Sequence, residues 1–222
     1  MHKVRLCFSK SGNQRFIGHL DFLRVFQQMI RRAELPAAYS LGFNPHLLLS
    51  FALPLPLGME SFNDYADLTL TAEVSNGEIV KSLNNHAPGG LVIKAAFPAE
   101  NKCASVISIA DYELNYDFNK EDVAVDVKNL LDSPQIFVMK KTKSGIKEAD
   151  IRPDILNIVL ENNKMTMRLS AGSARFLHPM VVAKLIFGEK LNPACFSRIE
   201  LYDMELKSLS YSELSNVDFH MS

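Results

Sequence analysis

A polar, basic loop that leads into an amphipathic helix is the part of the chain best suited to chemistry. Residues 9–15 read SKSGNQR, and the apolar spacing of residues 16–33 predicts a helix directly after them. Such a loop presents unpaired backbone N–H groups and the positive end of the helix dipole. Lys10 and Arg15 add two cations, so Lys10, Gly12 and Arg15 are candidate anion-binding residues, with RNA phosphate as the expected anion.

The first turn of this predicted helix holds two candidate catalytic residues. His19 falls on the apolar stripe of the helix, so we expect its ring to be mostly buried, with one nitrogen edge reaching the loop. It is either a neutral core histidine that holds the loop or a general acid/base acting on a bound phosphodiester or hydroxyl. Asp21 lies on the solvent side, where it caps the helix, compensates its dipole or takes part in catalysis.

Further polar residues extend the candidate anion- or RNA-binding set. Arg31, on the outer face of the same helix, is either solvated or one of a row of cations that contact the phosphates of a nucleic acid. Asn44 and His46 lie in a predicted turn, where a structural role and a contact with ligand are both open. Arg175 comes shortly before a predicted helix at 179–187, which gives the second half of the chain a candidate anion loop of its own.

Charge is strongly segregated along the chain, although the net charge is only −1. Residues 1–50 carry seven Lys or Arg and two acids, residues 51–132 carry five and thirteen, and residues 133–222 carry twelve and ten. The two basic zones are either ordinary solvated faces or, if the fold brings them together, the positive surface of a nucleic-acid binder. On the second interpretation, we expect one positive cleft lined by Lys10, Arg15, Arg152 and Arg175.

The order of predicted elements is the same in both halves of the chain. The first half reads strand 3–9, helix 16–33, strands 47–53 and 65–74, helix 76–85 and strand 91–97. The second reads strand 112–118, helix 120–131, strands 135–140 and 165–170, helix 179–187 and strand 198–206, with an extra strand 155–161 paired to 165–170. An element order of βαββαβ that occurs twice predicts an α+β protein of two tandem ferredoxin-like lobes with antiparallel sheets. The lobes are residues 1–108 and 109–222. We expect the first strand to pair with the strand from Tyr65.

Composition and motifs narrow the function classes. With 47% hydrophobic and 22% charged residues the chain should fold, and it has neither an apolar run of membrane length nor signal-peptide features, so we expect a cytoplasmic protein without membrane contact. The three cysteines (Cys7, Cys103 and Cys195) lack metal-ligand spacing, and we predict buried thiols, no metal and no cofactor. The lack of Walker, GxGxxG, nucleophile-elbow and HExxH motifs argues against nucleotide hydrolases, dehydrogenases, serine hydrolases and zinc proteases.

Several motifs resemble a bacterial family of unknown function whose members are either fused to the C-terminus of radical S-adenosylmethionine (SAM) proteins or occur as separate chains. They are residues 8–12 (FSKSG), 15–21 (RFIGHLD), 31–36 (RRAELP), 39–46 (YSLGFNPH), 50–58 (SFALPLPLG), 143–145 (KSG) and 150–153 (DIRP). Asp64 stands where the family pattern has Glu. The resemblance implies help with RNA or protein modification, and a radical SAM protein as partner.

Together these observations predict an RNA-binding accessory protein that assists tRNA or rRNA modification or processing with a radical SAM partner. The alternative is an enzyme acting on RNA through His19 or Asp21, similar to metal-independent endoribonucleases or to pseudouridine synthases. That analogy is one of fold, and fold does not imply function. A second alternative is a protein-interaction scaffold for a radical SAM enzyme. Whether the chain is an enzyme stays open at the level of sequence.

Overall fold

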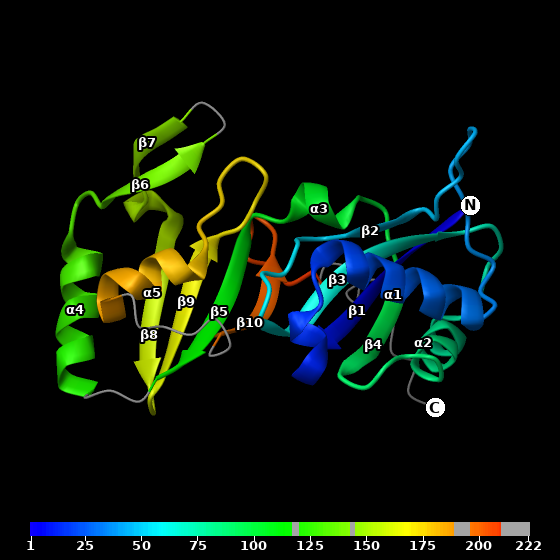
Figure 1. Cartoon of the computed structure of the whole chain (residues 1–222), viewed down its shortest axis with the longest axis horizontal. Helices are drawn as coiled ribbons and strands as arrows, with labels where there is room; N and C mark the ends of the chain where they lie inside the picture. Colours follow the sequence, from blue (N-terminus) through cyan, green and yellow to red (C-terminus); the bar gives the residue numbers. More distant parts are fainter. Residues whose placement is uncertain (117–119, 143–144, 189–195, 210–222) are drawn as a thin grey trace.

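One continuous, mostly antiparallel sheet runs through the protein. The computed structural model describes residues 1–116, 120–142, 145–188 and 196–209 (Figure 1). The strand order is β4 (Leu91–Pro98), β1 (His2–Lys10), β3 (Glu60–Leu70), β10 (Phe196–Tyr202), β5 (Ile109–Asn115), β9 (Lys164–Ser170) and β8 (Ile155–Glu161), with β2 (Leu49–Phe51) paired to β3. β10 runs parallel to β3, while the other pairs are antiparallel. Because β3 belongs to the first half of the chain and β10 to the second, the two halves meet at the β3–β10 contact.

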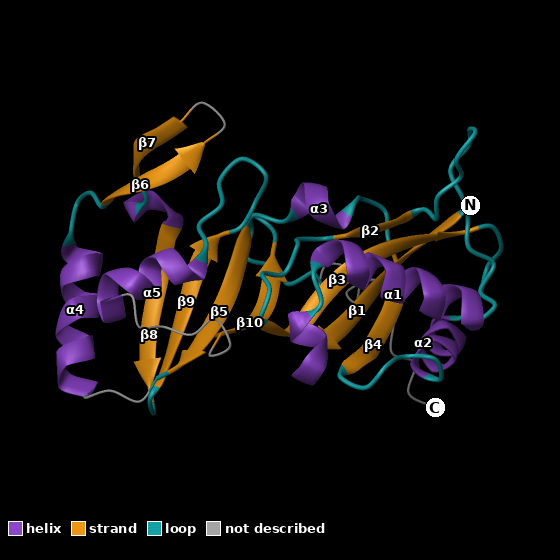
Figure 2. Ribbon diagram, viewed as in Figure 1, coloured by secondary structure: helices purple, strands orange, loops and turns teal. Residues whose placement is uncertain are grey.

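Two helices of the first half, α1 (His19–Arg32) and α2 (Asn76–Asn84), cover one face of β1, β3 and β4 (Figure 2). Alternation in β1 buries Val4, Leu6 and Phe8 against these helices. Phe8 has three other aromatic rings within 6 Å of its own ring centroid, those of Phe22, Phe26 and Phe51. The start of the helix predicted at 76–85 is confirmed, and Ser75 caps it, because the Ser75 side chain accepts a hydrogen bond from Glu78 N at 3.3 Å.

The second hydrophobic cluster spans both halves. It combines α4 (Lys120–Asp132) and α5 (Pro179–Phe187) with the strands of the second half, and it also contains Cys7, Met59, Tyr65 and Phe97 from the first half. The two halves therefore share a core. The boundary between residues 108 and 109 stays a prediction.

The mixed α+β class, the largely antiparallel sheet and the pairing of the first strand with the strand containing Tyr65 are confirmed. The pairing of 155–161 with 165–170 is also confirmed, across a turn in which Asn162 and Asn163 have φ of 45° and 62°. The strand predicted at 135–140 is β6 (Phe137–Thr142), which pairs with β7 (Gly145–Asp150) in a separate two-stranded sheet.

Two helical features differ from the prediction. The helix predicted at 16–33 begins later, because α1 starts at His19 behind an extended Gly18. The residues before it, most of them predicted as a loop, form a 3-10 helix, η1 (Gly12–Phe16). A short helix, α3 (Cys103–Val106), was not predicted, because four residues carry no periodicity. No helix in the described parts of the chain has both the length and the apolar character needed to cross a membrane.

A buried ion pair holds the β3–β10 contact together. Arg198, fully buried on β10, donates from Nη2 to both carboxylate oxygens of Asp64 at 2.7 Å and to the carbonyl oxygen of Leu53 at 2.8 Å. Beside it, the Tyr65 hydroxyl donates to Glu200 Oε1 at 2.6 Å. Burial raises the pKa of Glu200. Side chains of β3 and β10 thus make polar contacts in a dry environment, where a polar group that loses its hydrogen-bond partner strongly destabilises the fold.

Replacing Arg198 with methionine should strongly destabilise the protein, because it leaves Asp64 buried without its main partner. We expect a loss of about 3–5 kcal/mol in the free energy of unfolding, measured by denaturant titration. The control is Arg24→Met, which removes the exposed Arg24–Asp21 ion pair and should change the free energy of unfolding by less than about 1 kcal/mol. Equal effects of the two substitutions would contradict a structural role for the buried pair.

Candidate functional site

The loop predicted to bind an external anion already holds a carboxylate of the protein. Glu60 Oε1, at the start of β3, accepts hydrogen bonds from the backbone N–H of Gly12 at 3.0 Å and from Arg15 Nη1 at 3.3 Å. The loop is also fixed at Gly90, whose carbonyl oxygen accepts from Ser11 N at 2.8 Å. A Cβ at Gly90 would lie 2.4 Å from the Ser11 carbonyl oxygen, and φ there is +88°, so this contact requires glycine.

Arg15, whose side chain is 28% exposed, and the exposed Phe16 form a stacked pair next to Glu60. The guanidinium carbon of Arg15 lies 4.8 Å from the ring centroid of Phe16, and Phe16 is 56% exposed. Glu60 restrains the guanidinium through the contact of its Oε1 with Arg15 Nη1. The pair therefore presents a preorganised flat surface that combines a positive charge and a π face.

Lys10 points into the protein. Its Nζ donates to the carbonyl oxygen of Ile17 at 2.9 Å and lies 4.3 Å from the ring centroid of Phe22, and the residue is 2% exposed. Burial lowers the pKa of Lys10 to about 8, against the opposing effect of the nearby Asp64 carboxylate. Since Lys10 is buried, Lys10, Arg15, Arg152 and Arg175 do not line one surface, and that predicted cleft is wrong. Anion binding by Lys10 stays a prediction.

His19 lies at the rim of a small pocket rather than in the core. It is exposed, with its ring centroid 5.6 Å from that of Phe51, and the prediction of a mostly buried ring is wrong because α1 begins at this residue. The pocket has a volume of about 10 Å³, the scale of one water molecule. Its lining places the imidazole, the Lys10 amine and the Asp64 carboxylate around one small space; the full lining is Phe8, Lys10, His19, Phe22, Phe51, Leu53, Leu55 and Asp64.

Asp21, Arg31, Asn44 and His46 are all exposed. Asp21 accepts from Arg24 Nη1 at 2.6 Å, an i,i+3 ion pair in the first turn of α1. His46 Nδ1 lies 2.8 Å from Ser40 Oγ, which also accepts from His46 N, so this histidine closes its own loop. Ligand contacts of these four residues stay predictions.

The two candidate anion-binding residues of the second half, Arg152 and Arg175, make contacts within the protein. Arg152 donates from Nη2 to the Leu131 carbonyl oxygen and from Nη1 to the Ile155 carbonyl oxygen, each at 2.9 Å, and so joins the end of α4 to the start of β8. Arg175, 54% exposed, donates to Asp154 Oδ1 at 2.6 Å. Because β8 is five strand positions from β1, about 24 Å across the sheet, these cations belong to another region of the surface.

The sequence prediction missed a polar pocket on the other side of Glu60. It has a volume of about 130 Å³ and is lined by Ser9, Ser11, Glu60, Ser61, Phe62 and Lys94. The predicted strand began at Tyr65, so Glu60, Ser61 and Phe62 fell outside it. Only the strand β3 as observed, which starts at Glu60, brings them beside the ends of β1 and β4.

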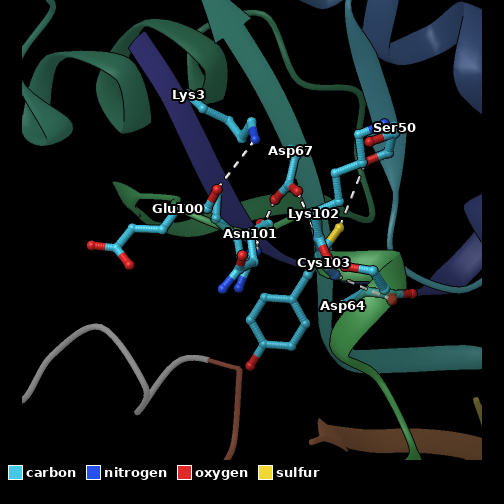
Figure 3. A network of polar contacts seen from close by, with 11 residues as sticks. Lys3, Ser50, Asp64, Asp67, Glu100, Asn101, Lys102 and Cys103 are labelled. Carbon is cyan, nitrogen blue, oxygen red and sulfur yellow. Dashed lines mark hydrogen bonds and ion pairs between the residues drawn. The ribbon is translucent and has the colours of Figure 1, made fainter.

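The thiols make structural contacts. Cys7 and Cys103 are buried, as predicted, and burial raises the pKa of Cys7 to about 11 and that of Cys103 to about 12. Asp67 accepts from Arg5 Nε at 2.9 Å. Figure 3 shows Asp67 beside Cys103, whose backbone N donates to it at 2.7 Å and whose Sγ contacts the Ser50 carbonyl oxygen at 3.9 Å. Cys195 lies outside the described residues. Among the residues described, no three His, Cys, Asp or Glu side chains are grouped to hold a metal ion.

The fold and these contacts define a mixed α+β protein in which the Glu60 carboxylate holds the loop of Gly12 and Arg15, and Arg15 stacks on Phe16. The chain belongs to the family described as "Uncharacterized protein conserved in bacteria (DUF2344)", whose model matches residues 3–179. The predicted membership of a bacterial family of unknown function is thereby confirmed. The comparison with curated proteins finds no match.

Among solved structures, the chain is similar to an unknown protein from Galdieria sulphuraria. The two are 10% identical with a TM-score of 0.29, over 84% of this chain and 88% of that one. The TM-score is too low to indicate a shared fold.

Stability should depend on the titration of Lys10 in a defined pH window. In the unfolded chain the lysine pKa is 10.5 and in the folded protein about 8, so between these values the unfolded state binds more protons and stability rises with pH. We expect the free energy of unfolding of the wild type to rise by up to about 3 kcal/mol relative to Lys10→Met over this window. Groups that titrate in both proteins cancel in the difference. A difference that stays constant from neutral to alkaline pH would contradict the lowered pKa.

Proposed function

We propose that this protein is a cytoplasmic RNA-binding accessory protein that assists tRNA or rRNA modification or processing. The observation that carries the proposal is the Arg15–Phe16 pair, in which the Phe16 ring is exposed. Proteins recognise unpaired RNA bases by stacking them on aromatic rings and on arginine planes. A ring that is already paired with a guanidinium, which Glu60 in turn restrains, loses little conformational freedom when a base stacks on it.

The outer face of α1 adds positive charge to the same region. Arg24, Arg31 and Arg32 are exposed on this helix, and Asp21 offsets one of them. Phosphate contacts of such side chains position a nucleic acid without reading its sequence. This arrangement supports a surface on which base stacking is combined with a modest electrostatic attraction.

We also propose that the two halves are tandem ferredoxin-like lobes. Supporting this, the strands of the first half follow the order β4-β1-β3-β2, and those of the second half follow the matching order β10-β5-β9-β8. The second half carries the β6–β7 hairpin as an insertion between its first helix and its second strand. Fold similarity alone does not assign a function, so the RNA proposal depends on the surface residues and not on the topology.

The resemblance described above supports a radical SAM protein as the partner in this function. The loop between α1 and β2 exposes Leu41 and Phe43 completely, with fractional exposures of 101% and 112%. Isolated apolar side chains are normal on a surface, but two neighbouring ones at the tip of a loop are suited to burial against a partner protein. The scaffold alternative uses this loop and needs no RNA.

A second candidate function is an enzyme acting on RNA through His19. The observation in its favour is the small pocket that is lined by both the His19 imidazole and the Lys10 amine, whose pKa burial lowers to about 8. General acid/base catalysis uses side chains that can donate or accept a proton at the reacting group, and histidine is the one most often used. Asp21 is less suited to this chemistry, because it is exposed and paired with Arg24.

RNA binding should depend on Phe16. Phe16→Leu keeps an apolar side chain but removes the stacking surface, and we expect about a tenfold loss of affinity for single-stranded RNA, measured by fluorescence anisotropy. Arg15→Gln should weaken binding too and lower the slope of log affinity against log salt by about 1. The matched control is Phe137→Leu, a similarly exposed ring on β6. Equal affinities of the Phe16 and Phe137 variants would rule out this stacking surface.

Catalysis, if present, should depend on His19 without added metal. His19→Gln should bind RNA like the wild type but lose at least about 10²-fold in turnover, because the amide cannot transfer protons near neutral pH. His86→Gln, at an exposed histidine elsewhere on the surface, serves as the control. RNA that stays intact and unmodified with the wild-type protein would leave only the binding function.

A further inference from the structure

The polar pocket beside Glu60 combines groups that suit a sugar. Its volume of about 130 Å³ corresponds to roughly four water molecules at liquid density, enough for one sugar ring. Three serine side chains, one carboxylate, one ammonium group and one aromatic ring line it. Hydroxyls and a carboxylate bind sugar hydroxyl groups, a lysine binds the adjoining phosphate, and a ring stacks with the base.

Ser61 supplies the observation that points to a ligand. It is 2% exposed, and its hydroxyl has no hydrogen-bond partner among the described residues. A buried hydroxyl without a partner is unfavourable and uncommon in folded proteins. The Ser61 Oγ is itself closed to solvent, so a ligand reaches it only after a rotation about the single χ1 torsion of serine, which has three staggered positions.

Glu60 is prepared to accept a hydrogen bond from a ligand. The Gly12 N–H and the Arg15 guanidinium both contact its Oε1, which stabilises the carboxylate and offsets its repulsion of a phosphate backbone. A carboxylate has more acceptor positions than these two bonds use. The 2′-hydroxyl of ribose is a donor that DNA lacks, and an acceptor at this place would distinguish the two nucleic acids.

Lys94 and Phe62 complete the pocket. Lys94 is exposed, and its Nζ donates to Asn63 Oδ1 at 2.9 Å, which leaves further N–H donors of the ammonium group for a phosphate. Phe62 is 48% exposed at the rim. Since Glu60 contacts Arg15, the pocket adjoins the Arg15–Phe16 pair, and neighbouring nucleotides of one strand can occupy both.

We propose that this pocket binds the ribose of a single-stranded RNA and that Glu60 and Ser61 recognise its 2′-hydroxyl, so that the protein selects RNA over DNA. The inference rests on the proposed RNA-binding function and adds to it the chemical basis of the selectivity. It assigns a ligand group to residues that the sequence did not single out.

The test compares oligonucleotides of about 12 nucleotides and one mixed sequence, made as RNA, as DNA and as 2′-fluoro RNA. The 2′-fluoro strand keeps an RNA-like sugar conformation but cannot donate a hydrogen bond. We expect the wild-type protein to bind RNA at least about fivefold more tightly than the DNA and 2′-fluoro strands, the effect of one hydrogen bond. Ser61→Ala should bind all three with the affinity that the wild type has for DNA, and Ser105→Ala, at an exposed serine bonded to the Lys102 carbonyl, should keep the preference.

Each result decides between distinct conclusions. If the wild type binds the 2′-fluoro strand as tightly as RNA, or if Ser61→Ala keeps the preference and only raises the melting temperature, hydroxyl recognition is overturned while RNA binding stands. If the wild type binds no strand at all, both the inference and the proposed function are overturned. The oligonucleotide series on the wild type does not depend on how the variants fold.

Discussion

The buried ion pair between Arg198 and Asp64 is the interaction on which the arrangement of the two halves depends. The parallel contact of β3 and β10 covers only two register pairs, Ser197 with Glu60 and Arg198 with Ser61. So short a ladder supplies few backbone hydrogen bonds, and the side chains must fix the remaining geometry. Burial has the largest single effect and would lower the pKa of the Arg198 guanidinium, but the effects of Asp64 and Tyr112 together raise it, which keeps the pair charged in a dry environment.

The same contact also builds the candidate sites. Glu60 and Ser61, which form one wall of the polar pocket, are the two β3 residues paired with β10. Asp64 holds Arg198 on one side and borders the pocket of Lys10 and His19 on the other. For Lys10, Asp64 favours the charged form and Arg198 opposes it. The position of β10 is therefore coupled, through one carboxylate, to the proton affinity of a residue on β1.

The sequence predicted most of what depends on local periodicity, and little of what depends on contacts between distant segments. Helix α5 and the antiparallel partners of β1 and β9 followed from alternation and turns. The β3–β10 contact and the β6–β7 hairpin did not, since a two-residue ladder and a mostly exposed strand leave no hydrophobic pattern. The inward direction of Lys10 could have been predicted from the sequence, because Lys10 continues the buried alternation of Val4, Leu6 and Phe8 by one step.

The loop that looked like an open phosphate site shows why charge alone predicts function poorly. Its N–H donor and its guanidinium already have an acceptor in Glu60, so an incoming phosphate competes with a carboxylate that is covalently part of the protein. With a net charge of −1, long-range attraction of RNA is also weak. Few phosphate contacts are then available, and most of the affinity on this surface must come from other short-range contacts: a base stacked on Phe16 and a sugar hydroxyl bound where Glu60 is already oriented.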